Sequence, residues 1–314
     1  MSIAPMLWKQ YRLEWGQRTH VMGIINVTPD SFAGDGLIKI SQDPTTEDAV
    51  VQRAVEQARQ YVEDGATLID VGGESTRPGA ATTPAEEEMA RVLPVITALR
   101  KALPTHAIIS IDTYKAEVAH RALECGADVV NDIWGFQHDP EMAAVVAQHG
   151  VPAVLMANMR GFQRRELLSD VTRFLARSID IALAAGVAWD HLILDPGLGF
   201  GTGPEGHLLL LRRLGELRIF GRPLLIGTSR KSAIGKVLGG LPPEERVEGT
   251  AATVALGIAQ GADIVRVHDV HAMMRVVKMS DAVVRGYSEP PPEITAVPER
   301  PPQGGSLHHR ESNV

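Results

Sequence analysis

Three polar side chains lie at or near the ends of short apolar runs, where a simple buried core would favour apolar residues. They are Asp112, Asn131 and Asp195. A flat heterocycle with an N–C(NH2)–N edge needs acceptors for its N–H groups and a donor for its carbonyl, and these residue types supply both. A buried acceptor left unpaired costs roughly 1–3 kcal/mol, so such groups discriminate strongly between ligands. Each residue alone is as well explained by structural hydrogen bonding, but the three together favour a heterocycle site.

Basic residues follow two further apolar runs. Lys231 and Ser232 stand at the start of a predicted helix over Ser232–Leu238, whose N-terminus would attract an anion. Ser232 could bind a carboxylate there, although an ordinary N-cap would explain a single serine. Arg266 and His268 alternate with valines, so both face the same side of a strand. An unpaired arginine inside a barrel would be costly, and we expect a bound anion rather than an internal salt bridge to compensate it.

Asn26 and Arg77 are two weaker candidates. Asn26 ends the first apolar run, where a structural and a functional role are equally consistent with its type. Arg77 lies in the polar segment Glu74–Gly79, either as a solvated charge or as a group that closes over a ligand. The sequence shows no thiol nucleophile, Ser–His–Asp order or His/Cys metal cluster. The indicated chemistry is displacement of an anionic, phosphate-like leaving group by a second substrate that carries a carboxylate.

The elements that position these residues form a repeating pattern of strand-length apolar runs and helical segments. Eight such units predict an α/β fold, a single-domain (β/α)8 TIM barrel with the active site at the C-terminal ends of the strands. That end of the barrel would bring residues distant in sequence into one cavity. The predicted strands are Val21–Asn26, Thr67–Gly73, Ala107–Asp112, Asp128–Asp132, Pro152–Asn158, Leu192–Gly197, Pro223–Lys231 and Asp263–Asp269.

Length and composition are consistent with one barrel and divide the chain into three parts. We expect an N-terminal strap over residues 1–18 across the barrel bottom, a barrel over 19–287 and a disordered, Pro-rich tail over 288–314. A net charge of −7 argues against a nucleic-acid partner, and the single cysteine excludes an intramolecular disulfide. We expect a cytoplasmic protein without membrane contact, since neither a signal peptide nor a membrane-length apolar run is evident. The long polar stretch Pro29–Pro44, before a helix near Thr46–Glu63, is expected to be a functional loop.

Seven motifs follow one another between about Thr19 and Arg285. They are INVTPDSF (25–32), DVGGESTRPG (70–79), SIDT (110–113), VVNDI (129–133), LDPGLGF (194–200), GTSRKS (227–232) and RVHDV (266–270). In this order they resemble the motifs of the dihydropteroate synthase family, whose members sulfonamides target. The resemblance implies condensation of 6-hydroxymethyl-7,8-dihydropterin diphosphate with p-aminobenzoate, which gives 7,8-dihydropteroate and diphosphate for folate synthesis. It also implies a Mg2+ cofactor and a homodimer.

The resemblance assigns a role to each candidate residue. The pterin would be held by Asp112, Asn131, Asp195 and Lys231. The diphosphate would be bound by Asn26, Arg266 and His268, with Asn26 also reaching Mg2+. The aminobenzoate side would be formed by Thr76, Arg77, Phe200 and Ser232. The catalytic set would be Asp112, Lys231, Arg266 and His268, and the family mechanism is dissociative: diphosphate departs first and the arylamine then attacks a pterin cation.

Two positions depart from the family pattern. Asn158 stands where a histidine is usual, and Thr202 stands where the glycine loop often continues with lysine. Three alternatives remain open: a corrinoid-dependent methyltransferase that binds a pterin, a degenerate paralogue without turnover, and a generic phosphate-binding barrel. The first and the last explain the residues less well, because methyl transfer has no use for a diphosphate site and a phosphate site has no use for the Asp112, Asn131 and Asp195 set.

Overall fold

Eight parallel strands close into a barrel in the computed structural model, which describes residues 3–28, 47–76, 80–163 and 166–287. The order is β8-β7-β6-β5-β4-β3-β10-β9, and a parallel bridge between Leu194 and Leu224 joins β8 to the β9 side. The predicted (β/α)8 fold and all eight predicted strands are confirmed. The strands are β3 His20–Asn26, β4 Leu68–Gly72, β5 Ile108–Asp112, β6 Val129–Asp132, β7 Ala153–Met156, β8 Leu192–Asp195, β9 Leu225–Ile226 and β10 Ile264–Val267.

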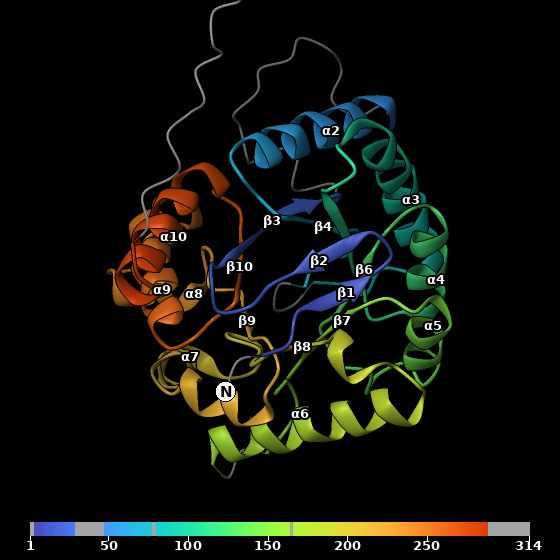
Figure 1. Ribbon diagram of the computed structural model, residues 1–314. Helices are drawn as coiled ribbons and strands as arrows, with labels where there is room; N and C mark the ends of the chain where they lie inside the picture. The colour runs from blue at the N-terminus through green and yellow to red at the C-terminus, as the bar shows by residue number, and fades with distance from the viewer. Residues whose placement is uncertain (1–2, 29–46, 77–79, 164–165, 288–314) are drawn as a thin grey trace, which may run out of the picture.

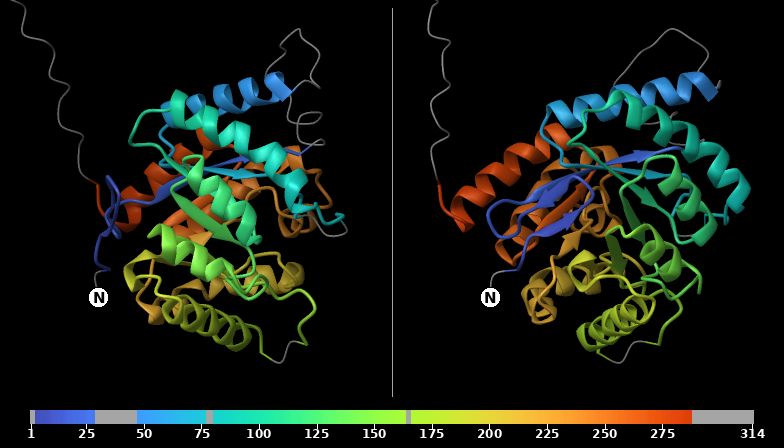
Figure 2. Two further views of the ribbon diagram at one scale, coloured as in Figure 1. Left: turned by 90° about the vertical axis from the view of Figure 1, so that its right-hand side faces the viewer. Right: turned by 45° about the vertical axis from the view of Figure 1, so that its right-hand side comes forward.

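Helices surround the barrel and follow its strands in sequence (Figure 1). The two views of Figure 2 show the same outer layer from other sides. The α-helices are α2 Glu47–Glu63, α3 Ala85–Ala102, α4 Ala116–Glu124, α5 Met142–His149, α6 Leu167–Ala184, α7 Gly203–Arg212, α8 Ser232–Val237, α9 Val247–Ala259 and α10 Val270–Val284. Short 3-10 turns are η1 Trp189–His191, η2 Leu214–Phe220 and η3 Pro243–Glu245. No helix in the described ranges is long and apolar enough to cross a membrane.

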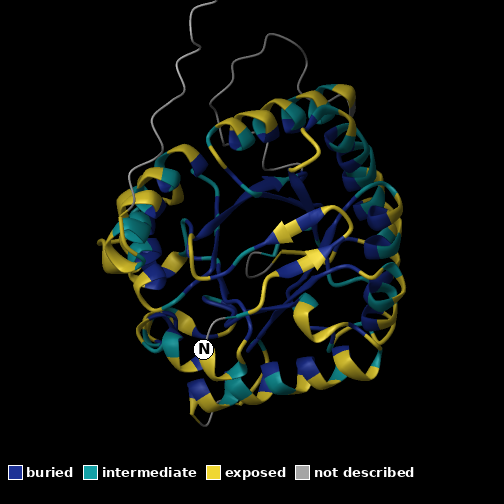
Figure 3. Cartoon of the chain, viewed as in Figure 1, coloured by how far each residue is buried: buried dark blue, intermediate teal, exposed yellow. Residues whose placement is uncertain are grey.

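The side-chain alternation of the strands gives the barrel an apolar lower layer and a polar upper layer. The lower layer contains one buried apolar residue from each strand: Met22, Leu68, Ile108, Val129, Val154, Ile193, Leu225 and Ile264. Two residues further along, the same face carries polar groups on several strands, among them Asp70, Asn131, Asp195 and Arg266. Figure 3 shows the contrast between the buried strands and the helices, which are exposed on their outer faces. The polar layer therefore lies toward the C-terminal strand ends.

A two-stranded hairpin covers the bottom of the barrel. Strands β1 (Met6–Trp8) and β2 (Tyr11–Leu13) pair antiparallel, and Figure 1 shows them in front of the barrel opening. Their buried side chains and Trp15 pack on the apolar lower layer. A closed sheet would otherwise leave these residues open to water at that end. Burial of apolar area at about 25 cal/mol per Å² makes this cover a stabilising part of the barrel.

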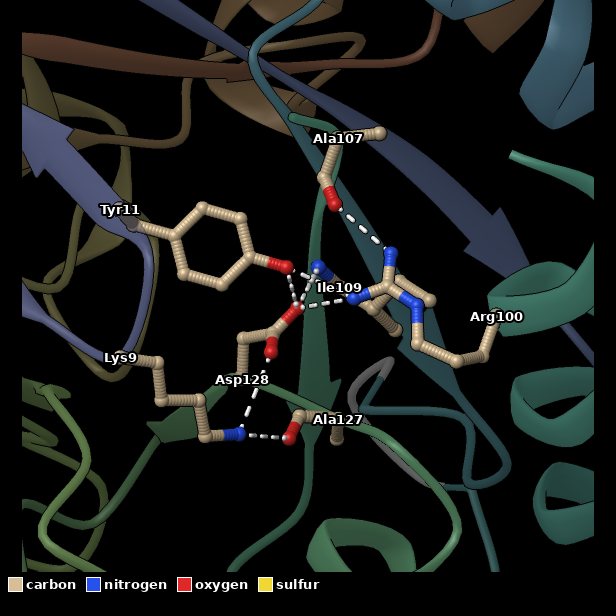
Figure 4. A network of polar contacts seen from close by, with 7 residues as sticks. All are labelled: Lys9, Tyr11, Arg100, Ala107, Ile109, Ala127 and Asp128. Carbon is tan, nitrogen blue, oxygen red and sulfur yellow. Dashed lines mark hydrogen bonds and ion pairs between the residues drawn. The ribbon is translucent and has the colours of Figure 1, made fainter. Parts of the chain in front are cut away.

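A buried carboxylate anchors the hairpin to the barrel (Figure 4). Asp128 accepts hydrogen bonds from the hydroxyl of Tyr11 at 3.0 Å, from the guanidinium of Arg100 at 2.9 Å and from the backbone N–H of Ile109 at 3.1 Å. Lys9 also donates to it, at 3.2 Å. Four donors converge on this one side chain, which joins the hairpin, α3 and two strands.

Replacement of Asp128 with alanine is expected to lower the free energy of unfolding by about 2–4 kcal/mol, because the cation of Arg100 and the other donors lose their acceptor. Urea denaturation measures this change. Glu14→Gln is the matched control, since the Glu14 pair with Arg12 is exposed and should contribute no more than about 1 kcal/mol. Equal effects of the two substitutions would contradict the anchoring role.

Candidate active site

A pocket at the C-terminal strand ends brings seven of the predicted site residues together. Its volume is about 410 Å³ when the space open to solvent at its mouth is included. The predicted residues that line it are Thr76, Asp112, Asn131, Asp195, Phe200, Lys231 and Arg266. The remaining lining residues are Ile133, Met156, Leu198 and Gly227. The pocket is therefore lined by carboxylates, cations and apolar side chains.

Arg266 is compensated by an internal salt bridge, which the sequence analysis had ranked below a bound anion; its binding of an anion stays a prediction. The Arg266 guanidinium donates from Nε to Asp70 and from an Nη to Asp112, both at 2.6 Å. Asp70 and Asp112 lie on β4 and β5, and only β3 separates β4 from β10 in the sheet. Burial lowers and the two carboxylates raise the pKa of Arg266, and the net direction is upward. Arg266 is therefore a permanent cation, held by two carboxylates before any substrate binds.

Asp70 is the principal site residue that the sequence analysis missed. Its side chain is fully buried, and its Oδ2 also accepts a hydrogen bond from the Asn131 amide at 3.0 Å. Asp70 thus fixes the orientation of both Arg266 and Asn131. A signal was available, because a single charged residue within the apolar run Leu68–Val71 faces the same side as Leu68 and Gly72.

Burial shifts the titration of the pocket side chains toward their neutral forms. It raises the pKa of Asp112 to about 7, with Asp70 adding to this and Arg266 opposing it. It raises the pKa of Asp195 to about 6, against a 2.7 Å hydrogen bond from the backbone N–H of Gly197. It lowers the pKa of Lys231 to about 8, assisted by the nearby Arg266. Groups that change charge between pH 6 and 8 within one cavity are typical of a functional site.

Two cations lie close to the aromatic ring of Phe200, which lines the pocket. Phe200 packs with Ile133 and Met156. Nζ of Lys231 lies 4.3 Å from the centre of the Phe200 ring, and the guanidinium carbon of Arg160 lies 4.7 Å from it. Cations over an aromatic face contribute about 0.5–2 kcal/mol. Arg160 is a second residue that the sequence analysis did not select.

Close backbone packing holds the loop that carries Phe200. Gly197 has a φ of +72°, and a Cβ there would lie 1.8 Å from the carbonyl oxygen of Ala157. Gly201 has a φ of +74°, and a Cβ there would lie 2.4 Å from backbone atoms of Met159 and Arg160. The glycines of the LDPGLGFG segment therefore let the loop after β8 rest directly on the backbone after β7.

Three predicted residues lie beside the pocket rather than in its lining. Asn26 is half-buried at the end of β3, next to Gly72 in the strand ladder. The ring of His268 is hydrogen-bonded through Nδ1 to Ser229 Oγ at 3.0 Å. Ser232 is exposed and is the first residue of α8, while Lys231 occupies the N-cap position. The structure does not bring these three side chains into the pocket lining, so their binding roles remain predictions.

Several other expectations lie outside the described residues. They concern Arg77, the loop Pro29–Pro44 and the tail 288–314. Within the described ranges, no group of three or more His, Cys, Asp or Glu side chains could hold a metal ion.

The two departures from the family pattern are buried near the pocket. Asn158 accepts a hydrogen bond from the backbone N–H of Arg160 at 3.2 Å and is fully buried. The Thr202 hydroxyl accepts one from the backbone N–H of Gly199, also at 3.2 Å. Both side chains therefore stabilise loops around Phe200 without entering the pocket lining.

The arrangement fits a planar, polar heterocycle that lies against Met156 and hydrogen-bonds at its edge. The region from residue 22 to 268 matches the model of a family described as "Pterin binding enzyme". The fold and the site thus define a pterin-binding enzyme of the (β/α)8 barrel class.

Comparison with individual proteins narrows the class. The dihydropteroate synthase of Bacillus subtilis is 48% identical over 276 residues, which cover 88% of this chain and 92% of that relative. The dihydropteroate synthase from Clostridium difficile, whose crystal structure was determined in the presence of pteroic acid, is 44% identical in sequence. The two structures match with a TM-score of 0.80 over 87% of this chain and 99% of that one. The dihydropteroate synthase of Xanthomonas albilineans with 4-aminobenzoic acid is 38% identical in sequence and matches with a TM-score of 0.80. This match covers 90% of this chain and 98% of that one. This chain belongs to the dihydropteroate synthase family, and the resemblance drawn from its motifs is confirmed.

Proposed function

We propose that this chain condenses 6-hydroxymethyl-7,8-dihydropterin diphosphate with p-aminobenzoate to form 7,8-dihydropteroate and diphosphate. The observation that carries the proposal is the pocket in which Asp112, Asn131 and Asp195 lie beside Lys231 and Arg266. Membership of the dihydropteroate synthase family supports it. Both reactants are small molecules, and one carries the leaving group and the other the nucleophilic amine.

The polar residues of the pocket would hold the pterin ring by its edge. Asp195 and Asp112 would accept hydrogen bonds from ring N–H and amino groups, and Asn131 would offer both a donor and an acceptor. Lys231 would donate to a ring carbonyl or nitrogen. Met156 would pack on a face of the ring. A substrate whose edge lacked these donors would leave buried carboxylates unpaired, at a cost of roughly 1–3 kcal/mol for each group.

The first chemical step would be cleavage of the C–O bond between the pterin methylene and the diphosphate. The electron pair leaves with the oxygen, so the methylene becomes a cation and the diphosphate gains negative charge. The Asp112 carboxylate would stabilise the cation, while Arg266 and His268 would stabilise the diphosphate. The Arg266 guanidinium suits both ends, because its five N–H donors exceed the two that its carboxylate partners use.

Asn26 fits a Mg2+ ion that is held mainly by substrate. Its amide oxygen is a hard ligand at the strand ends, and Mg2+ is commonly bound by one or two protein oxygens together with substrate phosphates. When bound, Mg2+ would neutralise charge on the leaving diphosphate.

The second step would form the C–N bond. The lone pair of the neutral arylamine attacks the methylene cation, and the resulting ammonium loses one proton to solvent. A neutral arylamine needs no strong general base for this attack. Thr76, Phe200 and Ser232, with Arg77 from outside the described residues, are proposed to bind p-aminobenzoate on the side of the pocket away from the pterin edge. A homodimer and a cytoplasmic location remain predictions.

The test is a direct assay of product. Purified protein is mixed with the dihydropterin diphosphate, Mg2+ and labelled p-aminobenzoate, and labelled dihydropteroate is separated and counted. Formation of product supports the proposal. Absence of product while the pterin still binds by calorimetry would favour a non-catalytic pterin-binding protein and would make a methyl-transfer assay the next experiment.

Pterin affinity is expected to fall as the pH drops through about 6. The pKa of Asp195 is raised to about 6 by burial, so this side chain loses its charge and one acceptor below that value. Affinity should then decrease by up to about tenfold for each pH unit below the pKa. Calorimetric titration with the pterin between pH 5 and 8 measures the dependence. Asp112, whose pKa is raised to about 7, should give a separate decrease near pH 7 that persists in Asp195→Asn. Asp195→Asn should bind more weakly and lose the decrease near pH 6, and an unchanged decrease there would contradict the assignment.

A further inference from the structure

The short segment Glu74–Thr76, directly after β4, is held at both of its ends by cations from other loops. It begins two residues beyond the end of the strand at Gly72, and Thr76 lines the pocket. A loop segment of this kind has no strand ladder to fix it. Side-chain contacts therefore decide where Thr76 lies relative to the pocket.

Lys115 holds the first end. Its ammonium pairs with the carboxylates of Glu74 and Glu88, and the three side chains are 15%, 11% and 1% exposed. The Tyr114 hydroxyl donates a further hydrogen bond to Glu74 at 2.9 Å. Tyr114 itself packs on the apolar group that contains Phe200. Glu74 is thus fixed to the start of α3 through Glu88 and to the loop after β5 through Tyr114 and Lys115.

Arg160 holds the second end. Its guanidinium donates to the carbonyl oxygen of Thr76 at 2.6 Å, and it lies over the ring of Phe200 at 4.7 Å. No carboxylate within the described ranges pairs with Arg160. Its half-buried charge is therefore stabilised by a carbonyl oxygen and an aromatic face, both of which belong to pocket-lining residues. Arg160 joins the loops after β4, β7 and β8.

We propose that Lys115 and Arg160 are positioning residues that fix Thr76 and Phe200 for the second substrate, the arylamine. The inference rests on the proposed function, because Thr76 and Phe200 are assigned to the aminobenzoate side. Neither cation lines the pocket, so each acts through the residue it holds. A displacement of about 1 Å in a positioning group can lower a rate by up to about 10²-fold. Loosening this segment should weaken arylamine use and leave pterin binding intact.

The experiment compares two conservative variants with wild type. Arg160→Met keeps an unbranched apolar side chain but removes the guanidinium and both of its contacts. Glu74→Gln removes the charge that pairs with Lys115 while the Lys115–Glu88 pair remains. Each should raise KM for p-aminobenzoate about tenfold, with the calorimetric affinity for the dihydropterin diphosphate within about twofold of wild type. Arg160→Lys keeps a cation near Phe200 and should recover part of the loss.

Arg173→Met is the matched control, because Arg173 is 67% exposed on α6 and pairs with Asp170 of the same helix. It should change neither KM nor pterin affinity. Unchanged KM in either test variant, or a parallel loss of pterin affinity, would overturn the proposal. A wild-type protein that makes no product would instead refute the proposed function, so the two failures are distinguishable.

Discussion

Replacement of Arg266 with alanine is expected to lower kcat/KM for dihydropteroate formation by about 10³-fold. Removal of one group that stabilises developing charge commonly costs 10²–10³-fold. Arg266 also pairs with Asp70 and Asp112, so its loss leaves two buried carboxylates without their cation. The pterin and diphosphate subsites should both be disturbed. Steady-state kinetics with labelled p-aminobenzoate measures the change.

Arg100→Ala separates this catalytic loss from a general loss of stability. Arg100 also pairs with a buried aspartate, and its side chain is 26% exposed against 21% for Arg266. Its partner Asp128, however, lies in the network beneath the hairpin at the opposite end of the barrel (Figure 4). Arg100→Ala should lower the unfolding free energy and leave kcat/KM within about threefold of wild type at a temperature where the protein stays folded. A similar loss of activity in both variants would show that Arg266 acts only through stability.

The fold was predictable from the sequence because its signals are local. Each strand is a short apolar run, and each helix after it has its own periodicity and a glycine-rich end. The structure of the barrel bottom was harder to predict from the sequence, since the hairpin β1–β2 consists of two three-residue strands. Strands that short give no clear alternation, and their burial depends on Trp8 and Trp15 meeting residues from the whole barrel.

The candidate site was predictable mainly from polar residues at or near strand ends. Asp112 and Asp195 end their strands, Asn131 lies one residue before the end of β6, and the structure brings them into one pocket with Lys231 from the N-cap of α8. Arg266 was placed in the site from the sequence, but its pairing with Asp70 and Asp112 was not predicted. An ion pair between β10 and β4 joins residues 196 positions apart, and period two indicates only the direction of each side chain. The depth at which strands that are not neighbours bring charges together depends on barrel register, which the sequence does not reveal.

The loop contacts of Arg160 were not predictable for a different reason. Arg160 follows β7 in a segment without periodicity, and its partners Thr76 and Phe200 belong to loops after β4 and β8. A lone arginine in a loop is usually a solvated charge. Only the tight backbone contact at Gly201 brings the two loops close enough for the guanidinium to lie over the ring.

Replacement of Asp70 with asparagine, a side chain of nearly the same volume, is expected to lower kcat/KM by about 10²-fold. The substitution removes the negative charge that accepts from Nε of Arg266 at 2.6 Å and from Asn131 at 3.0 Å. An amide at this place can accept through one oxygen only, and its NH2 group would face other donors. Asn131 and Arg266 should both lose their fixed orientation. Asp263→Asn, a buried aspartate at the lower end of the β10 side, is the control and should retain activity.

A double variant decides whether Asp70 acts through Arg266. If Asp70 serves only to orient that guanidinium, Asp70→Asn should cost little further activity in a protein that already carries Arg266→Ala, because residues that act as a unit are strongly non-additive. A full additional loss of about 10²-fold would assign Asp70 an independent role, exerted through Asn131 and the pterin edge. Measurement of pterin affinity in the same four proteins separates these cases. If Asp70 acts through Asn131, Asp70→Asn should weaken pterin binding whether or not Arg266 is present. If Asp70 acts through Arg266, the substitution should weaken pterin binding only in the protein that retains Arg266.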